Sequence, residues 1–302
     1  MRKSRIITGI GVSAIALLAL TACNSGTPGA DPTDGGDGGD SGSGALWEVE
    51  TDVSLEGSPT FDTMTERGGV VVGVKNDQPG LGMEDPTTGE RSGFDVDIAR
   101  WVAASLGFDE DQIEYVTIPS ANREQAIVNG DIDYYVGTYS ITDSRKEQID
   151  FAGPYFLTGQ GLLVAADNED INGPDDLEGK IVCSVTGSTP LQRIRDEYNP
   201  GDTVEYDTYS QCVEQLKAGS VDAITTDEAI LAGYVALEPD ALKIAGEPFS
   251  EERYGIGLAK GDTALQEHIN TLLTEGGDVW TALFEEHLAP AGIEGEQPEV
   301  DQ

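Results

Sequence analysis

The chain has 302 residues, with 56 acidic and 17 basic side chains and a formal net charge of −39. This acidity excludes nucleic acid as a partner, because the phosphate backbone would repel the protein, and we attribute it to solubility outside the cell rather than to a cationic substrate. Basic residues are so few that one placed within a motif is informative about an anionic ligand.

Residues 1–22 have the pattern of a secretory signal, with three basic residues, an apolar run from residue 6 to residue 20, and small residues before Cys23. The apolar run is too short to span a membrane. A cysteine after small residues resembles the lipobox of bacterial lipoproteins, which predicts a lipid anchor at Cys23 and attachment to the outer face of the cell membrane. The alternative is an ordinary secretory signal with an incidental cysteine, and both predict export.

Residues 23–60 are rich in Gly, Ser, Pro, Thr and Asp and contain few apolar side chains. Such a segment cannot bury enough apolar surface to fold, so we expect a disordered tether. Its aspartates lack the alternate spacing and the closing glutamate of a calcium loop, and we expect no metal site.

From residue 70 onward, short apolar strands alternate with helical segments, which predicts an α/β fold with parallel sheets and a ligand beyond the carboxyl ends of the strands. The expected strands are VVVGV (70–74), IEYVTI (113–118), DIDYYVG (131–137), KIVCSV (180–185), TVEYD (203–207) and VDAITT (221–226). The expected helices are 94–107, 122–130, 188–198, 210–218 and 227–237.

Two glycine-containing apolar strands, FLTGQGLLVA (156–165) and YGIGLA (254–259), are interpreted as crossings between two lobes. The first lobe would then consist of residues 61–158 and 254–290, the second of residues 159–253, and residues 291–302 would form an acidic tail. Bending at the two crossings would close the lobes on a ligand. The alternative is that both are ordinary core strands.

Polar loops follow the expected strands, and the one after residue 137 reads TYSITDSR. Its Arg145 offers a planar fork of donors that matches a carboxylate, and Ser140 and Thr142 add short hydroxyl donors. This arrangement predicts a carboxylate receptor, whereas a lone arginine is more often a solvated surface charge.

The loop runs on into IDFAGPYF (149–156), and together they resemble the signature of the bacterial extracellular solute-binding proteins of family 3, which serve ABC importers of polar amino acids. The resemblance covers about residues 70–288 and is greatest to the glutamate-binding lipoproteins of actinobacterial importers. It implies a periplasmic-binding-protein type II fold, with two lobes, two mostly parallel sheets and a two-strand hinge. It also implies an ABC permease as partner and no cofactor, and we expect a monomer.

By the same resemblance, Thr138 offers its carbonyl to the α-amino group of an amino acid, and Ser140 and Arg145 hold the α-carboxylate. From the second lobe, Thr189 adds a hydroxyl and a backbone N–H at a helix N-terminus, where the dipole favours an anion. Asp227 pairs with the ammonium group.

Lys75 and Arg123, with the hydroxyl of Ser120, match positions at which family members that bind acidic amino acids carry basic residues. Two cations favour glutamate or aspartate, because glutamine would leave buried charge unpaired at a cost of several kcal/mol. Tyr209 stands where one glutamate/aspartate-binding relative has histidine, which leaves the choice between those two ligands open. Binding of glutamine, asparagine or another polar amino acid is the alternative.

Three of these residues also have ordinary structural interpretations. Lys75 would be a solvated lysine, Arg123 would pair with its neighbour Glu124, and Asp227 would be the N-cap of a helix.

Cys183 and Cys212 remain once Cys23 carries a lipid, and in an oxidising compartment we expect them to form a disulfide. Closing a loop of this length stabilises the fold by roughly 3–4 kcal/mol in the chain-entropy model. Two buried free thiols are the alternative.

A dehydratase-like enzyme on the same architecture is the competing class. The chain's two histidines, His268 and His287, lie in the expected terminal helices, and no catalytic motif of a hydrolase, metalloprotease or P-loop enzyme occurs. We therefore expect no catalysis. A tethered sensor is disfavoured because no membrane-spanning signalling segment follows Cys23.

Overall fold

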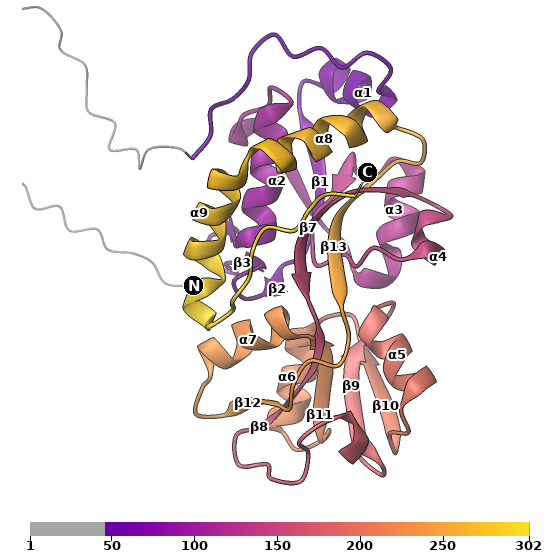
Figure 1. Ribbon diagram of the computed structural model, residues 1–302, viewed down its shortest axis with the longest axis vertical. Helices are drawn as coiled ribbons and strands as arrows, with labels where there is room; N and C mark the ends of the chain where they lie inside the picture. Colours follow the sequence, from indigo (N-terminus) through magenta and orange to yellow (C-terminus); the bar gives the residue numbers. More distant parts are fainter. Residues whose placement is uncertain (1–45, 302) are drawn as a thin grey trace, which may run out of the picture. The chain divides into compact units, whose positions relative to one another are not determined.

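The computed structural model describes residues 46–301 (Figure 1). The expected signal segment, the anchor at Cys23 and most of the expected tether lie outside the described residues. Within residues 46–301, no helix combines the length and the apolar character needed to cross a membrane.

The first lobe is built on a five-stranded sheet. Its strands are β1 (Val70–Val74), β5 (Ile113–Thr117), β6 (Tyr134–Tyr135), β7 (Asp150–Thr158) and β13 (Glu252–Leu258). Its helices are α1 (Pro59–Arg67), α2 (Phe94–Ser105), α3 (Arg123–Asn129), α4 (Asp143–Lys146), α8 (Thr263–Glu275) and α9 (Gly277–His287), with single turns η1 (Glu110–Gln112), η2 (Ser120–Asn122) and η4 (Ala289–Ala291). The strand order is β5-β1-β6-β13-β7.

The second lobe is built on another five-stranded sheet, in the order β10-β9-β11-β8-β12 (Figure 1). Its strands are β8 (Gln160–Ala165), β9 (Ile181–Val185), β10 (Asp202–Tyr206), β11 (Ala223–Asp227) and β12 (Leu242–Ala245). Its helices are α5 (Thr189–Glu197), α6 (Tyr209–Lys217) and α7 (Glu228–Leu237), with the single turn η3 (Pro174–Leu177).

Both sheets are mixed, so the expectation of mostly parallel sheets is only partly correct. In the first sheet, β5 and β6 run parallel to β1, and β13 runs antiparallel to β6 and β7. In the second, β10 and β11 run parallel to β9, and β8 runs antiparallel to β11 and β12. The antiparallel part of each sheet contains the strands that lead the chain between the lobes, because those strands pass out and back in opposite directions.

The chain crosses between the lobes at Gly159, which separates β7 from β8, and returns into β13. The apolar run 156–165 is therefore two strands in different sheets. A Cβ atom at Gly159 would lie 2.5 Å from the Ser250 carbonyl oxygen and 2.7 Å from Cβ of Pro248. The two crossing segments touch here, and only glycine permits that approach.

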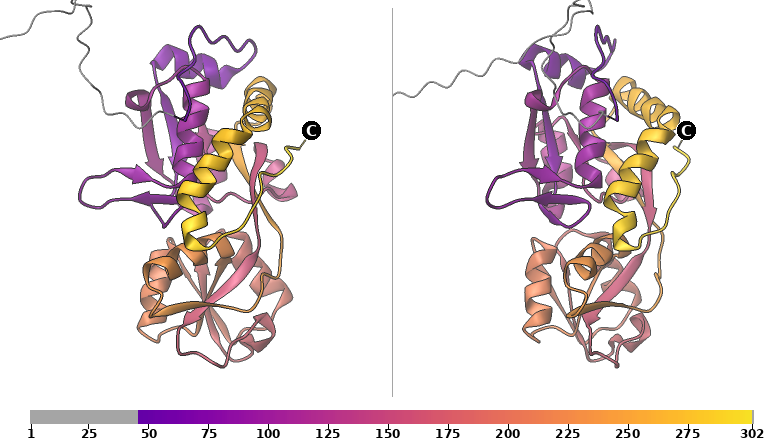
Figure 2. Two further views of the ribbon diagram at one scale, coloured as in Figure 1. Left: turned by 60° about the vertical axis from the view of Figure 1, so that its left-hand side comes forward. Right: turned by 90° about the vertical axis from the view of Figure 1, so that its left-hand side faces the viewer.

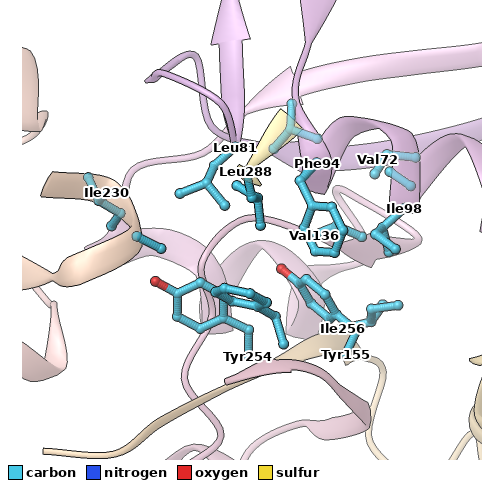
Figure 3. Close-up of a cluster of buried hydrophobic side chains, with 14 of the residues drawn as sticks. Val72, Leu81, Phe94, Ile98, Val136, Tyr155, Ile230, Tyr254, Ile256 and Leu288 are labelled. Atoms are coloured by element: carbon cyan, nitrogen blue, oxygen red, sulfur yellow. The ribbon is translucent and has the colours of Figure 1, made fainter. Parts of the chain in front are cut away.

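The apolar core continues across the two lobes (Figure 3). In the first lobe, the ring of Phe94 lies within 6.1 Å of the ring centroids of Tyr155 and Trp280. Ile230, on α7 of the second lobe, belongs to the same cluster of buried side chains. Tyr254, from the crossing strand β13, lies between them in the cluster and is fully buried.

Several parts of the chain differ from the sequence-based expectation, among them β12 and α1, which no expected strand or helix covers. Residues 77–92 form a small antiparallel sheet of β2 (Asp77–Gln78), β3 (Gly82–Glu84) and β4 (Arg91–Ser92), whose strands are too short to show a periodic pattern. The expected strand 131–137 is reduced to two residues. The last part of the expected tether packs on the first lobe, because Trp47, Val53 and Leu55 contact its core.

The outer edge of β7 is occupied by side chains and by the C-terminal segment, which Figure 2 shows running beside the crossing strands. Gln266 Nε2 donates to the Phe151 carbonyl at 2.6 Å, and Trp280 Nε1 donates to the Tyr155 carbonyl at 2.7 Å. Between them, Gly153 donates to a side-chain oxygen of α8 at 2.8 Å and accepts from the backbone N–H of Asp301 at 2.9 Å. Four of the strand's outward backbone groups are thus paired.

A disulfide joins Cys183 of β9 to Cys212 of α6, with the Cα atoms 5.7 Å apart. Both residues are fully buried. The predicted pairing is confirmed, and it fixes α6 to the second sheet.

Replacing both cysteines, in the Cys183→Ala and Cys212→Ala double variant, should lower the free energy of unfolding by roughly 3–4 kcal/mol. The reason is that the unfolded chain regains the freedom that the closed 29-residue loop removes. Urea denaturation of the double variant and of the oxidised parent measures the difference, and reduced parent protein serves as the matched reference. Equal midpoints for all three would contradict the expectation.

Candidate ligand-binding site

A small cavity lies where the two lobes meet, formed by loops at the ends of strands in both sheets. Its volume of about 10 Å³ is room for about one water molecule. Next to it is an open cleft of about 560 Å³ that shares Ser120, Ser188 and Thr189 with it. The cavity is lined by Ser120, Arg123, Thr138, Ser140, Ser188, Thr189, Pro190, Tyr209, Asp227 and Ile230.

Seven of the ten residues predicted from the sequence line this cavity, and the other three lie directly behind or beside it. Arg145 lines the adjoining cleft. Lys75 lies behind Ser120, with its amine 2.7 Å from the Ser120 hydroxyl. Thr142 also lines the adjoining cleft, and its hydroxyl caps α4 by accepting from the Arg145 backbone N–H at 3.3 Å.

Lys75 is buried, 5% exposed, which excludes the interpretation of a solvated lysine. Its amine donates to Ser120 Oγ and, at 3.3 Å, to the Ile118 carbonyl. Burial and the neighbouring Arg123 guanidinium lower the pKa of Lys75 to about 7. Within residues 46–301, the amine makes no ion pair.

Arg123 is 2% exposed, and among the described residues it has no carboxylate partner either. Its guanidinium lies 4.1 Å from the ring centroid of Tyr139 and donates to the carbonyls of Ser120 and Thr138, at 3.1 and 3.3 Å. The expected alternative of a pair with Glu124 is wrong, since adjacent helix residues do not face each other.

Arg145 takes Glu124 as its partner, with Nε 3.0 Å from the carboxylate. Its Nη1 donates to the Ser140 carbonyl at 2.6 Å, and Nη2 donates to the Gly187 carbonyl of the second lobe at 3.1 Å. Burial and the neighbouring Arg123 lower the pKa of Arg145. The fork therefore spans the junction of the lobes and faces the cleft.

Asp227, at the end of β11, is 3% exposed and supplies negative charge on the second-lobe side of the cavity. One carboxylate oxygen accepts from the Tyr254 hydroxyl at 2.7 Å, and the other has no hydrogen-bond partner among the described residues. Burial and the nearby Glu252 raise the pKa of Asp227 to about 7. The residue stands at the N-cap position of α7, but its side chain makes no capping bond, so capping does not explain it.

Thr189 connects the two lobes through its hydroxyl. It is the first residue of α5, which the Ser188 hydroxyl caps. The Thr189 hydroxyl donates to Glu252 at 3.1 Å and lies 3.3 Å from the Ser140 hydroxyl of the first lobe. Glu252 is held in turn by Arg193, 2.6 Å away. Sequence reasoning missed Glu252 and Arg193, which lie 63 and 4 residues from Thr189, because no local pattern links them.

Thr138 has a left-handed backbone, with φ of 46°, which is uncommon for a residue other than glycine. Asp95 of α2 holds it there, accepting from the Thr138 N–H at 2.9 Å and from the Tyr155 hydroxyl at 2.7 Å. Burial raises the pKa of Asp95 to about 6. The Thr138 carbonyl is thereby directed toward the cavity wall formed by Arg123.

Tyr209, the first residue of α6, is 4% exposed and forms the second-lobe wall of the cavity. Burial, with a smaller effect from Asp227, raises the pKa of Tyr209 to about 12. A neutral phenol thus faces the cavity on the side of Asp227.

Residues 70–277 of the chain match the family of bacterial extracellular solute-binding proteins, family 3. The chain belongs to this family.

Two curated members and one solved structure show how close the relationship is. Glutamate-binding protein GluB of Corynebacterium efficiens is 45% identical over 228 residues, which are 72% of this chain and 77% of that protein. A glutamine-binding protein of Geobacillus stearothermophilus is 40% identical over 205 residues, 68% of this chain and 78% of that protein. The cysteine-binding protein from Campylobacter jejuni has a TM-score of 0.73 and 27% identity, covering 80% of this chain and 98% of its own.

Membership of the solute-binding family confirms the predicted fold and function class: the chain is an amino-acid solute-binding protein and not an enzyme. The family is extracellular, which agrees with the expected export. The roles of the individual residues in the cavity stay predictions.

A buried carboxylate without a cationic partner should lower the stability of the folded protein when it is ionised. Because the pKa of Asp227 is raised above its unfolded value of 3.8, the folded protein binds more protons between that value and about 7, and its stability falls as pH rises through this window. At pH 8, Asp227→Asn should raise the free energy of unfolding by up to roughly 4 kcal/mol.

At pH 5 the gain should be less than half as large, because most of the window between 3.8 and about 7 lies above that pH. Chemical denaturation at both pH values measures the two differences. A stability gain of equal size at pH 5 and pH 8 would show that the carboxylate is not the cause.

Proposed function

We propose that this protein captures glutamate between its lobes and delivers it to an ABC permease. The observation that carries the proposal is the pair of buried cations, Lys75 and Arg123, which lack a carboxylate partner among the described residues. Buried charge without a counter-ion is costly, and a ligand with a second carboxylate would relieve that cost.

The ligand's α-carboxylate is assigned to Arg145, with Ser140 and with the hydroxyl and N–H of Thr189. The guanidinium fork faces the cleft and at present donates to carbonyl oxygens, which a carboxylate would replace with stronger, charge-assisted bonds. The N-terminus of α5 adds a favourable dipole.

The ligand's ammonium group is assigned to Asp227 and the Thr138 carbonyl. One carboxylate oxygen of Asp227 has no hydrogen-bond partner within residues 46–301, and the buried acid would gain an ammonium counter-ion. Tyr209 would close the pocket beside it, and Ser120, which already bonds to Lys75, would help to bind the side-chain carboxylate.

The side-chain pocket separates glutamate from glutamine, which the Geobacillus stearothermophilus relative is named for binding. An uncharged amide would leave Lys75 and Arg123 unpaired, whereas a carboxylate pairs with both. The glutamate-binding relative from Corynebacterium efficiens supports the acidic ligand. Aspartate, one methylene shorter, is the second candidate.

Binding would proceed by closure of the lobes. The present cavity is too small for an amino acid, so the lobes or the lining side chains must move apart to admit one. We further propose that the part of the expected tether before residue 46 links the protein to a lipid anchor on Cys23 at the outer face of the membrane, and that the protein works as a monomer.

The glutamate assignment is tested by calorimetric titration of the chain from residue 24 onward with glutamate, aspartate, glutamine and asparagine. Glutamate should bind at least about 100-fold more tightly than glutamine, a difference near 2.7 kcal/mol. Lys75→Met and Arg123→Met should each weaken glutamate by about 100-fold and glutamine by less than about tenfold, because only glutamate presents a second carboxylate.

Lys217→Met, which removes an exposed lysine of α6, is the matched control and should change neither affinity. Equal losses for both ligands in the Lys75 and Arg123 variants would refute the pocket assignment. If the parent protein bound glutamine more tightly than glutamate, glutamine would be the ligand instead.

The affinity for glutamate should pass through a maximum near pH 7. Above that pH the Lys75 amine is neutral in the free protein, so binding requires proton uptake and weakens as pH rises. Below it Asp227 is protonated in the free protein, so binding requires proton release and weakens as pH falls. Titrations between pH 5.5 and 9 measure this, and Lys75→Met should lose the alkaline decline alone. A flat profile for the parent protein would contradict both assignments.

A further inference from the structure

The two lobes also meet at a second place, outside the cavity. There Asp77 of β2, in the first lobe, touches two helices of the second lobe. Its carboxylate accepts from the Ser210 backbone N–H at the start of α6, at 3.1 Å. The Tyr234 hydroxyl of α7 donates to the Asp77 carbonyl at 2.5 Å and lies 3.4 Å from the carboxylate. A single residue of the first lobe thus holds both helices.

Gly233 of α7 makes this approach possible. A Cβ atom at Gly233 would lie 2.2 Å from the Pro79 carbonyl oxygen, which belongs to the loop after β2. That distance is far below van der Waals contact, and the obstructing atom is backbone, which cannot turn aside as a side chain can. Any larger residue at this position would hold α7 away from the first lobe.

Neither Asp77 nor Gly233 lines the ligand cavity. The helices that they hold do contribute to it, since α6 begins at Tyr209 and α7 carries Ile230. Asp77 follows Lys75 by two residues, in the same lobe. The contact therefore fixes the walls of the cavity from outside.

We propose that Asp77, Gly233 and Tyr234 form a closure clamp, a set of positioning residues that determines how tightly the protein holds any amino acid without touching the ligand. The clamp rests on the proposed binding by lobe closure. Its bonds exist only when the lobes are together, so they add to the stability of the closed form. A ligand whose binding requires that form loses affinity in proportion to the fraction of closed protein.

The clamp predicts opposite effects of Gly233→Ala on stability and on affinity. An alanine stabilises a helix interior relative to glycine, so the melting temperature of the ligand-free protein should stay equal or rise. The new methyl group prevents closure at Pro79, so the affinities for glutamate and glutamine should both fall, by at least about tenfold and by the same factor. A residue with a merely structural role would lower stability and affinity together.

Tyr234→Phe removes only the hydroxyl and leaves the charge near Lys75 unchanged, and it should weaken both ligands by about threefold to tenfold. Ala236→Gly is the matched control, because it changes helix propensity at an exposed position of α7 and should leave both affinities unchanged. Calorimetric titration and thermal unfolding measure these effects.

Wild-type affinity in Gly233→Ala would overturn the clamp while leaving glutamate capture intact. A wild-type protein that binds none of the tested amino acids would refute glutamate capture instead. In that case X-ray scattering of the ligand-free proteins still decides on the clamp: a larger radius of gyration for Gly233→Ala than for wild type supports it, and equal radii overturn it.

Discussion

The arrangement of the site depends on one constraint, the burial of cationic groups at the junction of two lobes. Burial, and then the mutual repulsion of Lys75, Arg123 and Arg145, lower the pKa values of Lys75 and Arg145. Among residues 46–301 the carboxylate of Glu124 pairs with one member of this cluster, Arg145. Such a cluster is stable only where other groups take the remaining donors. The Tyr139 ring does part of this, with Arg123 and Arg145 centred 4.1 and 4.9 Å from it.

The same cluster brings the second lobe close. Both guanidinium groups reach the Gly187 carbonyl, Arg145 at 3.1 Å and Arg123 at 3.5 Å. A Cβ atom at Gly187 would lie 2.6 Å from Cα of Ala121, so the donors reach that carbonyl only because the residue is glycine. Glycines thus permit close approach both beside the cavity and, at Gly233, away from it. At these two glycines the backbones of the two lobes are in direct contact. A small displacement of one lobe would therefore break the hydrogen bonds across the junction.

Local patterns in the sequence were sufficient for much of this architecture. The apolar run 70–74 coincides with β1, and the helices of the second lobe were placed within a residue or two, because valine-rich runs and helical spacing record burial directly. The crossing at Gly159 was harder, since the apolar pattern continues unbroken from one sheet into the other. The residues around the cavity were located through a family resemblance, and the structure brings them together.

What the sequence could not show are contacts between residues far apart in the chain. Glu124 was the alternative partner for Arg123 but bonds to Arg145, 21 residues away, and only the folded loop decides between the two arginines. The link from Thr189 to Glu252 and the support of Thr138 by Asp95 are of the same kind. Each of these hydrogen bonds joins two polar groups in a buried region. The partner is determined there by the three-dimensional arrangement of the loops, and the spacing of residues in the sequence does not indicate it.

The paired outer edge of β7 has a consequence for the protein among its own copies. An open edge strand offers a row of donors and acceptors to any other strand, and sheets that join edge to edge aggregate. Here the carbonyls of Phe151, Gly153 and Tyr155 are already taken by α8, α9 and the C-terminal segment. These bonds cover the middle of the edge, so a strand of a neighbouring copy finds few free groups there and edge-to-edge pairing is disfavoured.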